Sequence, residues 1–148
     1  MKSNKYDSLK LENQVCFPLY ACSKELIRQY NPHLQDLGLT YTQYIVMMVL
    51  WEKGEASSRE LAESLHLDYG TLTPVLKRME QSGYIVRTRS ADDERLLTLS
   101  LTEEGLKLKE KALDVPRCMS SVMGLTREEY EQLYKLTYKA LYNMESLN

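Results

Sequence analysis

Long hydrophobic runs, a signal sequence and paired cysteines are missing from this sequence. No apolar run in its 148 residues approaches the roughly 20 residues that cross a bilayer. The N-terminus, Met1 to Asp7, has no apolar segment of the kind that signal peptides carry. The three cysteines are an odd number and lie far apart, which argues against a disulfide framework. We therefore expect a cytoplasmic protein without a membrane partner, whose thiols are reactive or buried.

Metal-ligand and catalytic motifs are also missing. The two histidines, His33 and His66, are isolated from any cysteine or carboxylate cluster at metal-ligand spacing. There is no glycine-rich phosphate loop and no Ser/His/Asp arrangement. The sequence therefore predicts neither a metal nor a cofactor, and it does not favour an enzyme.

A net positive charge is absent as well, since 19 Lys and Arg stand against 21 Asp and Glu. Nucleic-acid-binding domains are often basic, so the formal net charge of −2 argues mildly against one. The distribution of charge matters more than the sum. Acidic residues crowd the C-terminal part, whereas basic residues gather at Lys77, Arg78, Arg87, Arg89 and Arg95. This asymmetry is compatible with DNA binding at one end of the molecule.

The stretch from residue 57 to residue 101 has the pattern of a winged helix-turn-helix. Ser57 and Glu60 have the spacing of a capping box, which predicts the start of a short helix. Asp68 is a suitable cap for a second helix, in which apolar residues recur at helical spacing. The pattern then becomes strand-like at residues 84–89 and again at 97–101, with a polar tip between them. Two short helices followed by a charged hairpin place the second helix in a DNA major groove.

The N-terminal segment predicts a helix from about Leu9 to about Leu34. Pro18 is unusual inside it, because proline removes a backbone donor. Either the helix kinks at Pro18, or an extended arm gives way to a helix near Phe17. One apolar face follows from the spacing of Leu11, Val15, Leu19, Cys22, Leu26 and Tyr30.

The remaining helices flank the winged-helix pattern. A helix at 41–53 is apolar almost throughout and should be the most buried. After the hairpin, Thr102 begins a helix that we expect to end near Val115, where Pro116 interrupts it. A capping box at Thr126 starts the last helix.

The predicted fold class is mainly α (α+β), a winged helix-turn-helix with N- and C-terminal helices that form a dimerisation domain. Residues 1–148 make one domain. Within it, residues 41–101 form the DNA-binding part, and residues 9–37 and 103–147 form the helical dimerisation part. The terminal helices are apolar without an evident place to pack within one subunit. A homodimer would cover them and would match a pseudo-palindromic operator in double-stranded DNA.

Two groups of motifs resemble a known family. The wing sequence Ser90-Ala-Asp-Asp-Glu-Arg95, followed by Leu101-Thr-Glu-Glu-Gly105, resembles the MarR family of dimeric transcriptional regulators. Within that family, the chain is similar to the organic hydroperoxide resistance (OhrR-like) repressors. The motifs that carry this similarity are Leu11-Glu-Asn-Gln-Val-Cys16-Phe, Tyr30, Leu39-Thr-Tyr41-Thr-Gln-Tyr44 and Asp68-Tyr-Gly-Thr-Leu-Thr-Pro74.

The resemblance implies a role for each matching residue. Cys16 matches the cysteine that senses peroxide, and Tyr30 and Tyr41 match the two phenols that bond its thiolate across the dimer. Cys118 has a position similar to that of the resolving cysteine in two-cysteine members, which implies a disulfide between Cys16 and Cys118 of two subunits. In the alternative, Cys118 is a partly buried bystander and a small thiol resolves Cys16.

The chemistry of Cys16 agrees with that role. A thiol reacts with peroxide as the thiolate, which phenol donors stabilise, and oxidation gives a sulfenic acid that a second thiol can trap. From periodicity alone, however, Cys16 is a small apolar residue on the stripe of the first helix. Cys22 lies too far along the helix to bridge Cys16 and is expected to pack in the core.

The DNA-binding residues are expected on the second helix of the motif and on the hairpin. Leu72, Val75, Leu76 and Met79 are better assigned to the core. Arg87 and Arg89 suit phosphates, or are simply solvated. By the resemblance, Arg95 enters the minor groove and Asp93 holds it. The helix offers Tyr69, Thr71, Thr73, Lys77 and Arg78 to bases or phosphates. Tyr69 stands where the family more often has a small serine.

The predicted function is a repressor that leaves its operator when Cys16 is oxidised by a peroxide. One alternative is a regulator that responds to a small phenolic ligand between the subunits. Another is a thiol peroxidase, which the absence of a Thr or Arg close to Cys16 disfavours. A third is a protein–protein adaptor, which would leave the basic wing residues without a role.

Overall fold

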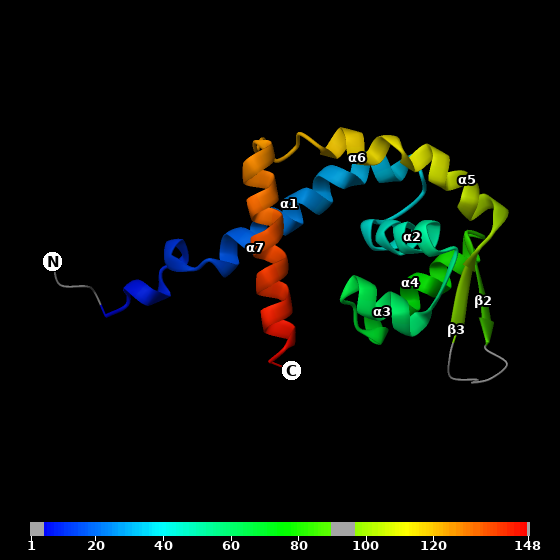
Figure 1. Ribbon diagram of the computed structural model, residues 1–148, viewed down its shortest axis with the longest axis horizontal. Coiled ribbons are helices and arrows are strands. Elements are labelled where there is room, and N and C mark those ends of the chain that lie inside the picture. The colour runs from blue at the N-terminus through cyan, green and yellow to red at the C-terminus, as the bar shows by residue number, and fades with distance from the viewer. Residues whose placement is uncertain (1–4, 90–96, 148) are drawn as a thin grey trace.

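A computed structural model describes residues 5–89 and 97–147. Figure 1 shows a winged-helix lobe, made of α2, α3, α4 and the β-sheet, with α1, α6 and α5 passing along one side of it. Helix α7 crosses α1, and the N-terminal arm (residues 5–15) extends away from the body. In chain order the elements are η1 (Asp7–Leu9), η2 (Leu11–Asn13), α1 (Cys16–Gln35), α2 (Tyr41–Lys53), β1 (Glu55–Ser57), α3 (Ser58–Leu65), α4 (Tyr69–Gln81), β2 (Ile85–Arg89), β3 (Leu97–Leu101), α5 (Glu103–Ala112), α6 (Asp114–Met119) and α7 (Arg127–Glu145).

The first helix begins later than Leu9. Two short 3₁₀ turns form the arm, and α1 starts only at Cys16. Pro18 therefore lies in the first turn, where a backbone N–H has no partner within the helix to lose. The prediction of a helix from Leu9 was wrong, and the alternative of an arm that leads into a helix near Phe17 is confirmed.

Helix α2 supplies the centre of the core, as its apolar composition predicts. Thr40 and Gln43 form the capping box at its start, and Gly54, at φ 81°, ends it. Val46, Met47 and Leu50 are fully buried. The neighbouring methionine behaves differently, because 47% of Met48 is exposed. Of these two adjacent methionines, only Met47 lies in the core. The buried cluster continues through Leu61, Leu72, Leu76, Met79, Ile85 and Leu99.

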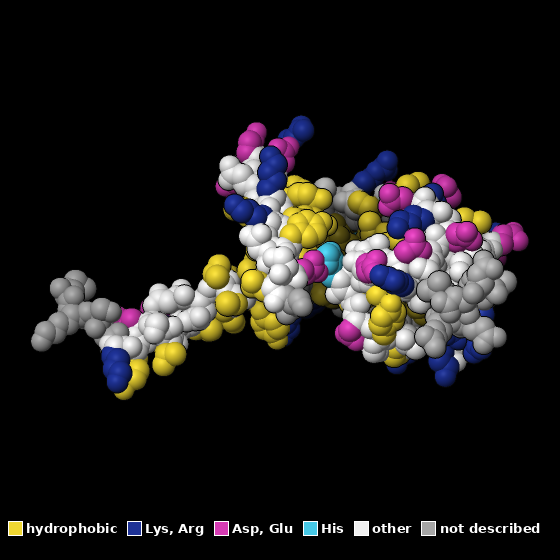
Figure 2. All heavy atoms as spheres, turned by 60° about the horizontal axis from the view of Figure 1, so that its bottom comes forward, with side chains coloured by type: hydrophobic (Ala, Val, Ile, Leu, Met, Phe, Trp, Pro, Cys, Tyr) yellow, Lys and Arg dark blue, Asp and Glu magenta, His cyan; other side chains and the backbone are white. Residues whose placement is uncertain are grey.

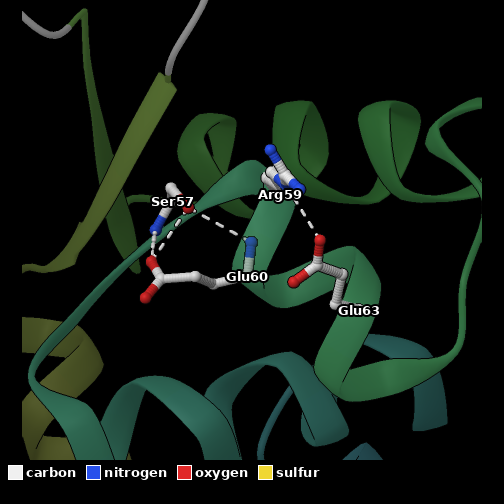
Figure 3. Close-up of polar contacts among 4 residues, drawn as sticks. All are labelled: Ser57, Arg59, Glu60 and Glu63. Atoms are coloured by element: carbon white, nitrogen blue, oxygen red, sulfur yellow. Dashed lines mark hydrogen bonds and ion pairs between the residues drawn. The ribbon is translucent and has the colours of Figure 1, made fainter.

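The helix-turn-helix and the hairpin have the predicted form. Figure 3 shows the capping box of α3, in which the Ser57 hydroxyl accepts from the Glu60 N–H and the Glu60 carboxylate accepts from the Ser57 N–H. Asp68 caps α4 by accepting from the Thr71 N–H. Strands β2 and β3 are antiparallel. The sequence did not predict β1, which pairs with the other edge of β3 and gives the sheet order β1-β3-β2.

One predicted helix is two helices. The expected helix from Thr102 to Val115 already ends at Ala112, and α6 begins at Asp114 with Pro116 inside its first turn. Pro116 therefore begins a helix instead of ending one, since the first turn tolerates a missing donor. As a consequence Cys118 lies within α6 and not in a loop after a helix end.

The terminal helices leave apolar side chains uncovered. Helix α7 has no buried residue. Figure 2 shows hydrophobic side chains along the arm and around the junction of the terminal helices with the lobe. The exposed large side chains of the arm, α1 and α7 include Leu9, Leu11, Val15, Phe17, Leu19, Tyr20, Tyr130, Tyr134, Leu136, Tyr138 and Tyr142. Among the described residues, no helix is both long and apolar enough to cross a membrane.

Candidate redox sensor and DNA interface

Cys16 is the first residue of α1 and is exposed. It stands where the arm joins the helix, and the side chains on either side of it, Val15 and Phe17, are exposed as well. A thiol in this place is open to a peroxide in solution, and its neighbours form an apolar surface. Periodicity alone suggested a packed residue on the helix stripe, but within one chain Cys16 is not packed.

Tyr30 and Tyr41 lie against each other at the other end of α1. Their ring centroids are 5.0 Å apart, and Tyr44 lies 6.0 Å from Tyr30. Burial raises the pKa of Tyr30, and the neighbouring phenols Tyr41 and Tyr130 raise it further. Burial also raises the pKa of Tyr41. Both phenols therefore keep their protons at neutral pH, so both are able to donate a hydrogen bond to an anion such as a thiolate.

One chain alone does not bring Cys16 and these phenols together. Cys16 and Tyr30 are 14 residues apart in the same continuous helix, which corresponds to about 21 Å along the axis. No side chain bridges that distance. A sensor made of Cys16, Tyr30 and Tyr41 therefore requires Cys16 from a second copy of the chain.

A groove opens beside Tyr30 where α1, α6 and the start of α7 meet. Its volume is about 590 Å³. Its walls include Leu26, Tyr30, Pro116, Met119, Met123 and Tyr130. Cys118 is exposed and lies in α6 between two of these wall residues, Pro116 and Met119. The predicted resolving cysteine and the predicted phenol donor are thus placed near the same groove by one subunit.

Cys22 is not a core residue. Its side chain is exposed in the chain and lines a smaller groove between α1 and α7, together with Leu19, Tyr130 and Tyr134. The prediction that it packs in the core was wrong for the single chain. Apolar periodicity placed Cys22 on the inner stripe of α1, but the part of that stripe near Cys22 faces a groove.

The recognition helix α4 presents the predicted polar face. Thr73, Lys77 and Arg78 are exposed, and 55% of Tyr69 is exposed. The core assignments are confirmed, with Leu72, Leu76 and Met79 buried and Val75 packed against them.

Thr71 is exposed too, but its hydroxyl already has a partner. It donates to the Asp68 carboxylate, which also accepts from the Thr71 N–H, and these two bonds lower the pKa of Asp68. Thr71 therefore has an acceptor to offer to DNA and no free hydroxyl proton.

The hairpin arginines differ from each other. The Arg87 guanidinium donates to the Glu80 carboxylate at 2.7 Å, and this hydrogen bond lowers the pKa of Glu80. Arg87 therefore joins the hairpin to α4. Arg89 is exposed near the end of β2. The predicted wing residues Asp93 and Arg95 lie outside the described residues.

Arg59 is a candidate that the sequence analysis did not identify. It lies in the first turn of α3 and pairs with Glu63 at 2.8 Å, as Figure 3 shows. The hydrogen bond and the charge of Glu63 raise the pKa of Arg59, and the phenol of nearby Tyr69 contributes. An exposed guanidinium beside the start of α4 suits a phosphate contact, since the first helix of the motif crosses the DNA backbone. The signal was an arginine two residues after the capping serine.

Among the described residues, no group of three or more His, Cys, Asp or Glu side chains lies close enough together to hold a metal ion.

Comparison with known proteins gives one consistent result. A family model described as transcriptional regulator SarA/Rot matches residues 28–112. An organic hydroperoxide resistance transcriptional regulator of Bacillus subtilis is 50% identical over 141 residues, which is 95% of this chain and 93% of that protein.

Solved structures are similar over the same length. Reduced AbfR bound to DNA, a Staphylococcus epidermidis protein, is 34% identical with a TM-score of 0.78 over 97% of this chain and 99% of that chain. Disulfide-formed AbfR is also 34% identical, with a TM-score of 0.63 over 93% and 96% of the two chains. A mutant of MarR from E. coli complexed with operator DNA is 22% identical, with a TM-score of 0.80 over 94% and 99% of the two chains. This last likeness concerns the fold alone.

Proposed function

Because the chain belongs to the MarR family of transcriptional regulators, in the group of the organic hydroperoxide resistance regulators, we propose that it is a cytoplasmic homodimeric repressor. In its reduced form it binds a pseudo-palindromic operator in double-stranded DNA. Oxidation of Cys16 by an organic hydroperoxide releases it. The chain is a regulator in this proposal, and no catalytic turnover is assigned to it.

One observation carries the proposal. Two partly buried phenols form a pair about 21 Å from the exposed thiol that they would serve in their own chain. A second copy resolves this separation if its Cys16 reaches the Tyr30–Tyr41 pair of the first. The large apolar side chains that the arm, α1 and α7 expose support such a dimer, because clustered exposed apolar residues mark interaction surfaces. The two-fold symmetry of the dimer also supplies two recognition helices for two half-sites.

DNA binding is assigned to α4, the hairpin and the start of α3. Lys77 and Arg78 offer cations, and Tyr69 and Thr73 offer hydroxyls, from the exposed face of α4. Arg59, in the first turn of α3, and Arg89, at the end of β2, offer further cations to phosphates. By resemblance, Arg95 enters the minor groove with Asp93 beside it, and Arg95→Ala should weaken operator binding at physiological salt. Arg87 acts through Glu80 by fixing the hairpin to α4.

The chemical step has a simple balance. The Cys16 thiolate attacks one peroxide oxygen, so an S–O bond forms and the O–O bond breaks. The other oxygen leaves as the alcohol after it takes up a proton, and the sulfur is oxidised by two electrons to the sulfenic acid. The Cys118 thiol of the partner then displaces water from that sulfur and forms the disulfide. Cys118 is exposed on α6, whose residues Pro116 and Met119 line the groove of Tyr30, and this position supports the second step.

Release of DNA follows from a change in the spacing of the two recognition helices. Hydrogen bonds from Tyr30 and Tyr41 hold the reduced thiolate between α1 and α2 of the partner. Oxidation removes that anion, and the disulfide draws α6 toward the arm of the other subunit. The two winged-helix lobes then rotate and no longer match successive major grooves, which lie about 34 Å apart.

The test is an operator-binding assay with reduced and peroxide-treated protein. The DNA is a fragment that the reduced protein selects from a random-sequence pool, and cumene hydroperoxide is the oxidant. We expect wild type to lose binding and to regain it with dithiothreitol, whereas Cys16→Ser binds the same DNA before and after treatment. Release of Cys16→Ser by peroxide would sink the proposal.

The resolving step has its own test in non-reducing electrophoresis. Peroxide-treated wild type should run as a covalent dimer and Cys118→Ser as a monomer, with Cys22→Ser as the matched control that still forms the dimer. A covalent dimer of Cys118→Ser would assign resolution to another thiol.

A second candidate function is release by a small phenolic ligand. The groove of about 590 Å³ beside Tyr30, with mostly apolar walls, favours it. In that case the response to peroxide would not depend on Cys16, so the same titration of Cys16→Ser separates the two functions. A thiol peroxidase would instead turn over cumene hydroperoxide repeatedly with excess thiol, which we do not expect.

A further inference from the structure

The C-terminal end of α7 contacts the helix-turn-helix at a place that the proposed function does not use. The His66 Nδ1 and the Glu145 carboxylate form a hydrogen-bonded pair. The Tyr142 ring lies edge-on to the His66 ring, with centroids 6.3 Å apart. We refer to these three residues as the α3–α7 contact. A shallow groove beside it is lined by Glu63, Asp68 and Tyr69, so the contact adjoins the start of α4.

His66 occupies a strategic backbone position. It ends α3 in the left-handed conformation, at φ 52°, and its N–H bonds to carbonyls of the last turn of α3. Asp68, two residues later, caps the recognition helix. His66 is thus the first residue of the turn that joins α3 to α4. A side chain that holds His66 in place also holds the start of α4.

The other end of α7 reaches the proposed sensor. Tyr130 lines the groove of Tyr30 and contributes to the raised pKa of Tyr30. Along the same face, the ring of Tyr134 lies 4.8 Å from that of Tyr138, and Tyr138 lies 5.6 Å from Tyr142. From Tyr130 to Tyr142 the helix rises about 18 Å. One helix therefore touches both the sensor groove and the turn before α4.

We propose that His66 and Glu145 are positioning residues for DNA recognition: through the α3–α7 contact, α7 holds the recognition helix in the orientation of the reduced dimer, and oxidation of Cys16 breaks this contact. The inference rests on the proposed function. It names α7 as the element that connects the redox sensor to the DNA-binding part. A displacement at the Tyr30 groove moves the start of α7, and the helix passes that displacement to His66. Coupling of this kind requires an element with two arrangements that both sites bias.

The contact is well suited to a role in orientation and poorly suited to one in stability. The side chains of His66 and Glu145 are 31% and 43% exposed, and ion pairs at such sites contribute little to folding. Loss of the contact should therefore change operator affinity while thermal stability stays near that of wild type. Glu63 also faces the groove, but Arg59 pairs with it and so offsets its charge.

The experiment uses full-length variants and the operator fragment described above. Glu145→Ala removes the carboxylate, and His66→Asn removes the imidazole while asparagine still tolerates the left-handed backbone. Each variant, in the reduced state, should bind the operator about 5-fold more weakly, at the lower end of typical allosteric couplings. Binding by the oxidised protein should stay unchanged, so the ratio of reduced to oxidised affinity falls by the same factor.

Three comparisons make the result specific. The double variant should bind no more weakly than either single variant, because the two side chains act through one contact. Glu145→Gln keeps the hydrogen-bond acceptor and should restore most of the affinity. Glu104→Ala is the matched control, since it removes an exposed carboxylate that pairs with Lys107 on α5, outside α7 and α3, and it should bind as wild type does.

The inference fails if the variants weaken both redox states equally, if the losses of the two single variants add, or if reduced Glu145→Ala binds with wild-type affinity. Failure of the proposed function looks different, because in that case peroxide does not release wild type at all. A thermal midpoint for each variant, expected within about a degree of wild type for surface changes, separates misfolding from misorientation.

Discussion

The winged-helix lobe and the terminal segments (the arm, α1 and α7) are built in opposite ways. The lobe closes on itself: three of its elements begin with side-chain caps, and a continuous set of apolar residues on α2, α3, α4 and the sheet is buried. The terminal segments have long, well-formed helices, yet α7 buries none of its residues. A helix of this composition is stabilised mainly by packing. The difference indicates that the lobe folds around its own core, and it supports the proposal that a second copy covers the terminal segments.

The largest expected effect is a loss of stability of the lobe when its core is opened. Leu50→Ala removes a fully buried side chain at the centre of the core, and we expect the free energy of unfolding to fall by about 3 kcal/mol. Urea titration followed by circular dichroism measures this loss. Leu106→Ala, at a position that is 53% exposed on α5, should leave the urea midpoint nearly unchanged. An equal loss in both variants would show that the core is not centred on α2.

The second-largest effect is expected at Gly105, where α5 packs closely against the backbone of Tyr84. A Cβ on Gly105 would lie 2.2 Å from the Tyr84 carbonyl oxygen. Alanine normally favours a helix over glycine by about 1 kcal/mol. Here the clash with backbone reverses the sign, and we expect Gly105→Ala to destabilise the protein by about 2 kcal/mol.

The thermal midpoint measures this loss, and Gly70→Ala is the control. A Cβ at Gly70 meets only the movable carboxylate of Asp68 at 2.9 Å, so its cost should be clearly smaller. A more stable Gly105→Ala would contradict the close approach of α5 to the start of β2.

The two regions also differ in what their sequences predict. The caps at Ser57, Asp68 and Thr126 were all predicted, because each depends on residues three positions apart. The core of the lobe followed from helical spacing. Strand β1 did not, since three residues have no detectable alternation and form a strand only by pairing with β3.

Contacts between distant residues account for the other gaps. The Arg87–Glu80 pair joins a strand to a helix, and the His66–Glu145 pair spans 79 residues. The site residues Cys16, Tyr30 and Tyr41 were identified from the resemblance, but periodicity placed Cys16 and Tyr30 on one apolar stripe of the first helix. The resemblance already implied a contact across the dimer, and the continuous helix α1 shows why one chain alone cannot make it. Sequence spacing describes neighbours along one helix and says nothing of the copy that faces it.

A charge on α7 tests whether the terminal segments are completed by a second copy. Leu136 is 64% exposed in the chain, and Leu136→Asp places a carboxylate in the proposed interface. We expect the dimer dissociation constant to rise at least about tenfold, which is about 1.4 kcal/mol, while the unfolding midpoint of the lobe stays the same. Sedimentation velocity over a dilution series measures the change. Lys111→Asp, on the exposed side of α5, is the control, and an equal shift there would indicate a general charge effect.

The smallest effect concerns the charge of Asp68, which caps the recognition helix α4, as distinct from its hydrogen bonds. Hydrogen bonds from the Thr71 hydroxyl and N–H lower the pKa of Asp68 from its usual 3.8. A group with a depressed folded-state pKa adds stability that is fully present above the unfolded value and is lost as pH falls through the folded value. Asn caps a helix about as well as Asp but does not titrate. We therefore expect wild type to be slightly more stable than Asp68→Asn at about pH 7, and the difference to shrink as pH falls below 3.8 and through the lowered folded-state pKa. Thermal midpoints of both proteins across this range measure it. A stability difference that is independent of pH would contradict a contribution from the Asp68 charge and would leave only the hydrogen-bond geometry of the cap.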